Sequence, residues 1–95
     1  MKTIYISGRI TGIENQAPFL FKAAERELIE QGWEVINPLT INHAENSEWI
    51  DYMRTDIKAL VDCDAIFMLS NYTQSNGAII ELAIANMLKF KVIFQ

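Results

Sequence analysis

One carboxylate stands apart from its surroundings in this sequence. Glu81 lies in the apolar segment 77–88, Gly-Ala-Ile-Ile-Glu-Leu-Ala-Ile-Ala-Asn-Met-Leu, which predicts a helix that is hydrophobic on nearly every face. Such a helix is normally buried, and burying an ionised carboxylate is costly unless it is paired or its pKa rises. Gly77, one helical turn earlier on the same face, leaves space above the carboxylate. Glu81 is therefore either a ligand-site residue or a glutamate paired inside the protein.

Two loops offer further polar groups. Gly8 follows a strand-like run, and its missing side chain lets a ligand approach the backbone. Ser75 precedes the Glu81 helix, so its hydroxyl and the nearby N–H groups form an anion site of the kind found at helix N-termini. The alternatives are a plain turn at Gly8 and simple helix capping by Ser75. Gly8 and Gly12 fit neither a dinucleotide fingerprint nor a P-loop, so no cofactor is expected.

Strand-like and helix-like segments alternate along the chain. The expected strands are 2–6, 33–36, 65–69 and 91–94, and the expected helices are 18–31, 47–62 and 77–88. This alternation implies right-handed crossovers and a parallel sheet with helices on both faces. We therefore predict an α/β fold of flavodoxin-like type. It is a three-layer α/β/α sandwich in which four parallel strands, numbered along the chain, take the order 2-1-3-4.

A sheet of this kind binds ligands at the carboxyl ends of its strands. Three loops are expected to meet there, namely 7–17, 37–46 and 70–76. His43 lies in the second of these polar loops and is expected to be an exposed bystander. Asp64 begins a strand at the opposite edge, where capping or turn formation is expected. Trp49 and Tyr52 are expected either to stack on a nucleobase or to be buried at an interface.

Length and composition restrict the class of protein. The 95 residues suggest a single domain, 1–95, and 51% hydrophobic with 21% charged residues is typical of a globular protein. The net charge of −4 and the dispersed basic residues argue against a nucleic-acid polymer as partner. Cys63 is the only cysteine and is expected to pack, and no metal site is expected. No run is long enough to span a membrane, so we expect a cytoplasmic protein.

Self-association is also expected. A small core and several large apolar side chains exceed what one domain of this size buries alone. Examples are Trp49, Tyr52, Met53 and Met87. We therefore predict a homodimer or larger assembly, with the helices after the second and third strands as contact surfaces.

Three groups of residues together resemble the nucleoside 2-deoxyribosyltransferase superfamily. They are Ile4 to Gly12, Tyr52 to Ile57 with Cys63 to Ala65, and Ser75 to Ala78 with Glu81. Over nearly the whole chain, their order and spacing are most similar to a small phage and bacterial family of uncharacterised proteins grouped with that superfamily. The resemblance implies cleavage of the bond between a nucleobase and deoxyribose. Deoxyribosyltransferases and 2′-deoxynucleoside 5′-phosphate N-hydrolases do this through the glutamate of a Ser-x-Gly-x-x-x-Glu motif.

The same resemblance implies two catalytic residues. Glu81 matches the nucleophile that attacks the anomeric carbon and forms a glycosyl-enzyme. Asp56 matches an aspartate that orients the sugar or the nucleophile and takes part in proton transfer. The alternative for Asp56 is a solvated position on an amphipathic helix, paired with Arg54 or Lys58.

The resemblance also implies a substrate-binding set, a nucleoside or nucleotide partner, and no cofactor. The residues of this set are Tyr5, Gly8, Arg9, Ile10, Ser75 and Gly77. Arg9 departs from the phosphate hydrolases, which commonly have serine there, and it either binds a phosphate bidentately or points into solvent. Because folds alone do not carry function, the alternative is a non-catalytic module that binds or senses a nucleotide in the same crevice.

Overall fold

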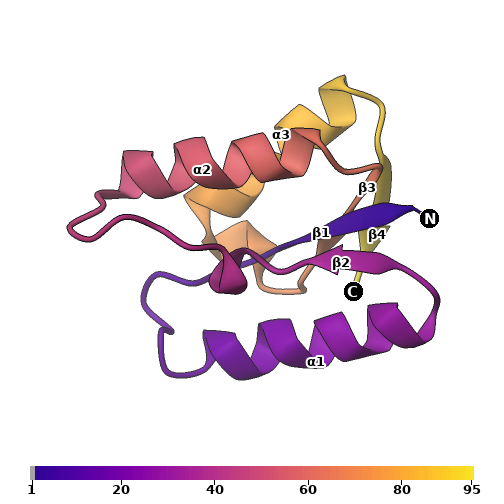
Figure 1. Cartoon of the computed structure of the whole chain (residues 1–95), viewed down its shortest axis with the longest axis horizontal. Coiled ribbons are helices and arrows are strands. Elements are labelled where there is room, and N and C mark those ends of the chain that lie inside the picture. Colours follow the sequence, from indigo (N-terminus) through magenta and orange to yellow (C-terminus); the bar gives the residue numbers. More distant parts are fainter. Residues whose placement is uncertain (1) are drawn as a thin grey trace.

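The structure, a computed structural model that describes residues 2–95, has the predicted alternation of strands and helices (Figure 1). The strands are β1 (Thr3–Ser7), β2 (Glu34–Ile36), β3 (Ala65–Met68) and β4 (Lys91–Phe94). The helices are α1 (Ala17–Glu30), α2 (Trp49–Val61) and α3 (Asn76–Met87). Two short 3-10 turns, η1 (Pro38–Thr40) and η2 (Tyr72–Gln74), lie in segments predicted to be loops.

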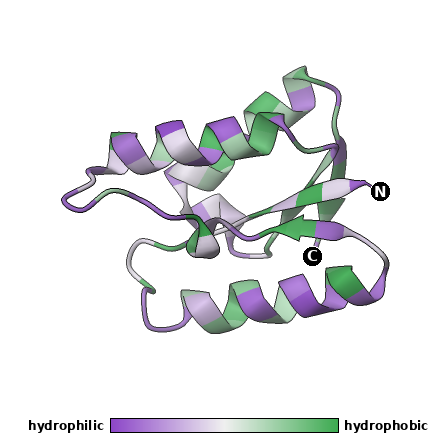
Figure 2. Cartoon of the chain, in the orientation of Figure 1, coloured by the Kyte–Doolittle hydropathy of each residue, from purple (hydrophilic) through white to green (hydrophobic). Residues whose placement is uncertain are grey.

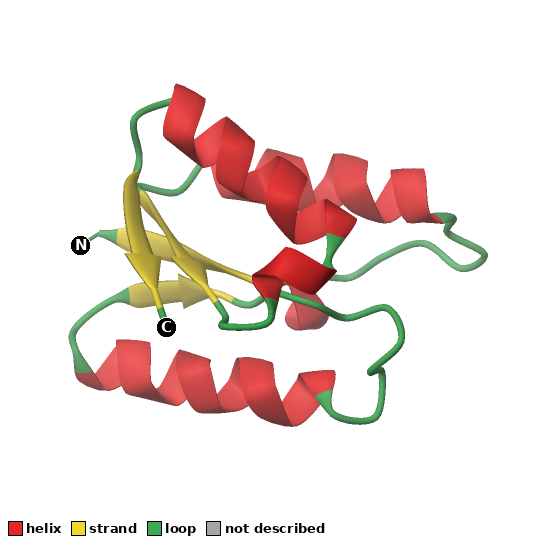
Figure 3. Cartoon of the chain, turned by 180° about the vertical axis from the view of Figure 1, so that it is seen from behind, coloured by secondary structure: helices red, strands yellow, loops and turns green. Residues whose placement is uncertain are grey.

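The four strands form one parallel sheet in the order β2-β1-β3-β4, as predicted. Helix α1 covers one face, and α2 and α3 cover the other, which completes the three layers (Figure 3). All four residues of β3 are buried, in keeping with its continuous apolar run. The loops that follow β1, β2 and β3 leave the same edge of the sheet, opposite the N-terminus (Figure 1).

Alternation along β1 decides which side chains reach which layer. Ile4 and Ile6 belong to the core cluster that contains Phe21 and Leu28 of α1. Tyr5 belongs to the cluster on the other face, with residues of α2 and α3. Because successive side chains of a strand point to opposite faces, Ser7 lies on the same face as Tyr5. Two hydroxyls of β1 therefore point toward α3.

Local capping fixes where the two helices next to the crevice begin. Glu48 and Asp51 form a capping box at the start of α2, each side chain bonded to the backbone N–H of the other residue. At the start of α3, the Ser75 hydroxyl accepts a hydrogen bond from the backbone N–H of Ala78 at 3.1 Å. The predicted capping by Ser75 is therefore confirmed.

The expectation that α3 is buried all round is wrong for a single copy of the chain. Only Ala78, Glu81 and Ala85 are buried, whereas Ile79 is 46% and Met87 is 84% exposed. Green segments of the α3 ribbon in Figure 2 mark its apolar residues. The reason is that α3 packs on the sheet by a narrow face of small residues. No helix in residues 2–95 has both the length and the hydropathy needed to cross a membrane.

Candidate functional site

Glu81 is buried, 5% exposed, and is held by two hydroxyls of β1. Tyr5 Oη donates to Glu81 Oε2 at 2.7 Å, and Ser7 Oγ donates to Glu81 Oε1 at 2.6 Å. Burial raises the pKa of Glu81 to about 7, against the opposing effect of the two hydrogen bonds, and the charge of Asp56 raises it further. Of the two sequence-based alternatives, internal pairing is confirmed, because both carboxyl oxygens accept hydrogen bonds from β1, and the ligand-site role stays a prediction.

Asp56 of α2 is also buried, and its partner is His43. His43 Nε2 lies 3.0 Å from Asp56 Oδ1, and the His43 ring packs against Tyr52 with ring centroids 4.6 Å apart. Burial raises the pKa of Asp56, and the contact with His43 lowers it by less. The prediction of an exposed bystander at His43 is wrong, as is the alternative pairing of Asp56 with Arg54 or Lys58.

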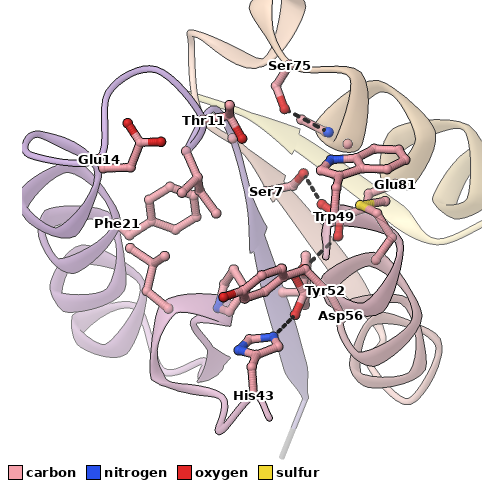
Figure 4. Close-up of a pocket in the computed structure, with 18 residues that line it drawn as sticks. Ser7, Thr11, Glu14, Phe21, His43, Trp49, Tyr52, Asp56, Ser75 and Glu81 are labelled. Carbon is pink, nitrogen blue, oxygen red and sulfur yellow. Dashed lines mark hydrogen bonds and ion pairs between the residues drawn. The ribbon is translucent and has the colours of Figure 1, made fainter. Parts of the chain in front are cut away.

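Glu81 and Asp56 line one cavity of about 420 Å³ (Figure 4). Its walls come from the loop after β1, the segment after β2, the first turns of α2 and the start of α3. Three carboxylates line it, and no Lys or Arg does. Its chemically distinctive residues are the carboxylates Glu14, Asp56 and Glu81 and the aromatic residues Phe21, Trp49 and Tyr52. The cavity is thus acidic, with apolar surfaces on which a flat ring can stack.

Most of the predicted binding residues line this cavity, and Arg9 does not. The five that do are Tyr5, Gly8, Ile10, Ser75 and Gly77. Arg9 lines a second cavity of about 520 Å³, which shares four residues with the first and contains no carboxylate. The shared residues are Thr11, Trp49, Ser75 and Gly77. One site therefore has an acidic chamber beside a basic one.

The Arg9 guanidinium is held in place rather than free in solvent. Its Nε donates to the Thr11 carbonyl at 3.1 Å, and its Nη1 donates to Gln74 Oε1 at 3.2 Å. Gly12 has φ +89, and a Cβ there would lie 2.6 Å from Arg9 Nη2. Glycine at this turn thus provides both the backbone conformation and the room for the guanidinium.

Close packing explains the other two glycines of the site. A Cβ at Gly8 would lie 2.6 Å from Leu69 Cδ1, and a Cβ at Gly77 would lie 3.1 Å from Met53 Sδ. The space beside Gly77 is thus bounded by Met53 of α2. Gly77 also lines the cavity that Glu81 reaches.

Sequence reasoning missed Ser7, Thr11, Glu14 and His43. Ser7 had a usable signal, because residues i and i+2 of a strand share a face and Tyr5 was already a candidate. Thr11 and Glu14 lie in an irregular loop, and His43 meets Asp56 only after the chain has turned into α2, so none of these three carried a periodic signal.

Asp64 accepts hydrogen bonds from the backbone N–H and hydroxyl of Thr3, which agrees with the predicted structural role. No three potential metal ligands cluster anywhere in residues 2–95.

Comparison with known proteins gives a family and a fold. Residues 2–94 match the family model described as Domain of unknown function (DUF4406). The chain belongs to this family. No curated protein sequence matches this DUF4406 chain.

Two solved structures similar to the DUF4406 chain are deoxyribosyltransferases. The 2-deoxyribosyltransferase of Bacillus psychrosaccharolyticus has a TM-score of 0.73 and 20% identity, and the match covers 97% of this chain and 70% of that one. The enzyme from Leishmania mexicana has a TM-score of 0.74 and 17% identity, with 99% and 63% covered. The chain thus spans under two thirds of the second structure. These matches confirm the predicted deoxyribosyltransferase-like fold.

Proposed function

We propose that this protein cleaves the N-glycosidic bond between a nucleobase and 2-deoxyribose, with Glu81 as the nucleophile. The observation that carries the proposal is the setting of this carboxyl. Glu81 is buried, yet it lines an open cavity, and hydroxyls rather than a cation hold its two oxygens (Figure 4). Once ionised, a carboxylate without a cationic partner has its negative charge available to the electron-poor anomeric carbon of the sugar.

The reaction has two halves, as in a retaining glycosidase. In the first, a Glu81 oxygen bonds to C1′ and the C1′–N bond breaks. The departing base keeps the electron pair of that bond and takes a proton from the Asp56 carboxyl. In the second half, a water oxygen attacks C1′ and gives its proton to Asp56, and the ester to Glu81 breaks. A second nucleobase in place of the water gives transfer instead of hydrolysis.

The proposed roles require an ionised Glu81, although burial raises its pKa to about 7, and a protonated Asp56. Burial raises the pKa of Asp56, which favours the protonated form that an acid needs. The pKa of the Tyr5 phenol is raised well above its ordinary value by burial and by Glu81, so it stays protonated and keeps its donor toward the nucleophile. Because Glu81 must be ionised and Asp56 protonated, we expect kcat/KM to fall at both low and high pH.

The two chambers suggest how a substrate is placed. The acidic chamber with its aromatic walls suits an uncharged base and the sugar, as phosphate is repelled by carboxylates. The second chamber offers Arg9 and the start of α3, both of which attract anions. The arrangement favours a 2′-deoxynucleoside that carries a 5′-phosphate.

The test is release of free base. The full chain is incubated with 2′-deoxynucleosides and their 5′-monophosphates, with and without a second base, and the products are separated by chromatography. We expect release by wild type, and loss of about 10³-fold or more in kcat for Glu81→Gln and Glu81→Ala. Glu27→Gln, at an exposed position on α1, is the matched control and keeps wild-type activity.

Two other results would reject the proposal. If wild type binds a deoxynucleotide by calorimetry and releases no base, the protein is a binding or sensing module. If Glu81→Gln retains wild-type kcat, another group is the nucleophile.

A further inference from the structure

His43 is the only histidine of the chain and faces the proposed acid of the reaction. The His43 and Asp56 side chains are 14% and 11% exposed, so water has little access to their contact. The partner oxygen is Oδ1, 3.0 Å from Nε2. In the tautomer that carries its proton on Nε2, His43 donates this hydrogen bond to Oδ1.

The second oxygen of Asp56 has a different environment. Oδ2 accepts no hydrogen bond from any residue in the described range 2–95. In that range, no polar side-chain atom is both fully buried and without a hydrogen-bond partner. Oδ2 is therefore not sealed inside the protein, and Asp56 lines the cavity that Glu81 reaches. It is the oxygen available to a ligand.

We propose that His43 is a positioning residue that acts through Asp56, holding Oδ1 so that Oδ2 meets the substrate. This inference rests on the proposed function, because it assigns His43 a part in proton transfer between Asp56 and the departing base. His43 itself touches neither the base nor the sugar in this role.

The chemistry explains why Asp56 needs such a partner. When Oδ2 gives its proton to the base, a carboxylate forms in a largely buried place, which is unfavourable without a donor. The other ionisable groups that face Asp56 are Tyr5 of β1 and Glu81 of α3, and neither brings a positive charge. The N–H of His43 stabilises the carboxylate more than the acid. Its effect therefore grows as the bond to the base breaks, and it accelerates the reaction.

A purely structural role is the competing explanation. The His43 ring also packs on Tyr52, with centroids 4.6 Å apart, and this contact anchors the irregular segment between η1 and α2. An anchor alone affects stability and substrate affinity. It does not change how readily Asp56 loses its proton.

Turnover of variants separates the two roles. We expect His43→Ala to lower kcat by about 10-fold to 100-fold with a smaller change in KM. We expect His43→Gln, which keeps an N–H donor, to recover part of the lost kcat. The limb of the pH profile set by Asp56 moves to higher pH in His43→Ala. In an Asp56→Asn background, loss of His43 has little further effect, because the two residues act as a unit. Glu45→Ala, exposed in the same segment, is the control and keeps wild-type kcat.

Carbon-13 NMR of the Asp56 carboxyl gives a second readout that needs no turnover. We expect its pKa to be higher in His43→Ala than in wild type, with His43→Gln between them. An unchanged pKa overturns the inference, as does a fall in thermal stability with kcat and the pH profile unchanged. If wild type releases no base from any substrate, the proposed function fails. The carboxyl titration then tests by itself whether His43 lowers the pKa of Asp56.

Discussion

At the scale of single residues, the site is built from ionisable groups whose partners are mostly uncharged. Glu81 is bonded to two hydroxyls, and Asp56 to an imidazole. Neither carboxyl forms an ion pair with Lys or Arg among the described residues. Asp64, whose role is structural, differs from these two carboxyls. It is exposed, and hydrogen bonds from Thr3 hold its pKa below the ordinary value. Desolvation without a compensating cation thus distinguishes the residues proposed to be catalytic.

The raised pKa of Glu81 predicts a measurable loss of stability as pH rises. The carboxyl has a pKa of about 7 in the folded protein against 4.5 ordinarily, so between these values the folded state holds a proton that the unfolded state has lost. The free energy of unfolding therefore falls from about pH 4.5 to pH 7 by up to about 3 kcal/mol from this group. Glu81→Gln removes this dependence.

Urea unfolding followed by circular dichroism at pH 5 and pH 8 tests this. We expect Glu81→Gln to gain in stability over wild type as pH increases, and Glu27→Gln to follow wild type at both values. A constant difference between Glu81→Gln and wild type would mean that Glu81 titrates normally in the folded state.

At the scale of elements, the ends of β1, α2 and α3 assemble the site. The β1 strand supplies hydroxyls, α2 supplies Asp56, and α3 supplies Glu81, each from a segment whose start or end is fixed by local hydrogen bonds. Arg9 links two of the loops, because its backbone N–H donates to Asn71 Oδ1 at 2.9 Å and its guanidinium reaches Gln74. The basic chamber therefore lies where the loops after β1 and β3 meet.

Substitution of Arg9 is expected to discriminate between substrates. Arg9→Ala removes the only Lys or Arg side chain among the residues that line either chamber. It should raise KM for a 2′-deoxynucleoside 5′-monophosphate by about 10-fold or more and change KM for the free nucleoside little, since a charged hydrogen bond to phosphate contributes roughly 1.5–3 kcal/mol. Arg9→Lys should recover part of the difference.

Steady-state kinetics with each substrate pair measure the effect, and Arg26→Ala, at an exposed position on α1, is the control. An equal change for phosphorylated and free substrates would show that Arg9 supports the loops without contacting a phosphate.

At the scale of the whole molecule, several large apolar side chains of α2 and α3 are exposed in a single copy of the chain. The exposed apolar residues on α2 and α3 include Ile50, Val61, Ile79, Ile80 and Met87. These helices cover the same face of the sheet (Figure 3). Large exposed apolar areas mark contact surfaces, so the prediction of a homodimer or larger assembly through these helices stands as a proposal.

Sedimentation velocity over a wide range of concentration tests self-association. We expect wild type to sediment as a dimer or larger species, and Ile79→Asp or Met87→Asp to shift it toward monomer by placing a charge in the contact. Phe19→Asp, on the 77% exposed Phe19 of α1, should leave the assembly unchanged. A wild-type monomer at every concentration would remove the proposal.

The sequence by itself determined the layers, the strand order and the choice of Glu81 as a candidate. Local patterns are sufficient for these, because alternating strands and helices leave few topologies, and a charge inside an apolar helix is visible without knowing its neighbours. Resemblance to deoxyribosyltransferases then pointed to Asp56 and to the loop residues. The boundaries of the elements followed equally local signals, such as the serine before α3.

Only the tertiary structure decided which groups meet across the fold. His43 was misjudged because its partner lies in another element and no spacing rule links the irregular segment to α2. From the sequence, Arg9 could either bind a phosphate or point into solvent. The direction of its side chain depends on Gly12, Thr11 and Gln74 together. Which residues of α3 are buried also needed the structure, because hydropathy records the composition of a helix and not which of its residues meet the sheet. Contacts between elements depend on packing in three dimensions, which a single segment does not encode.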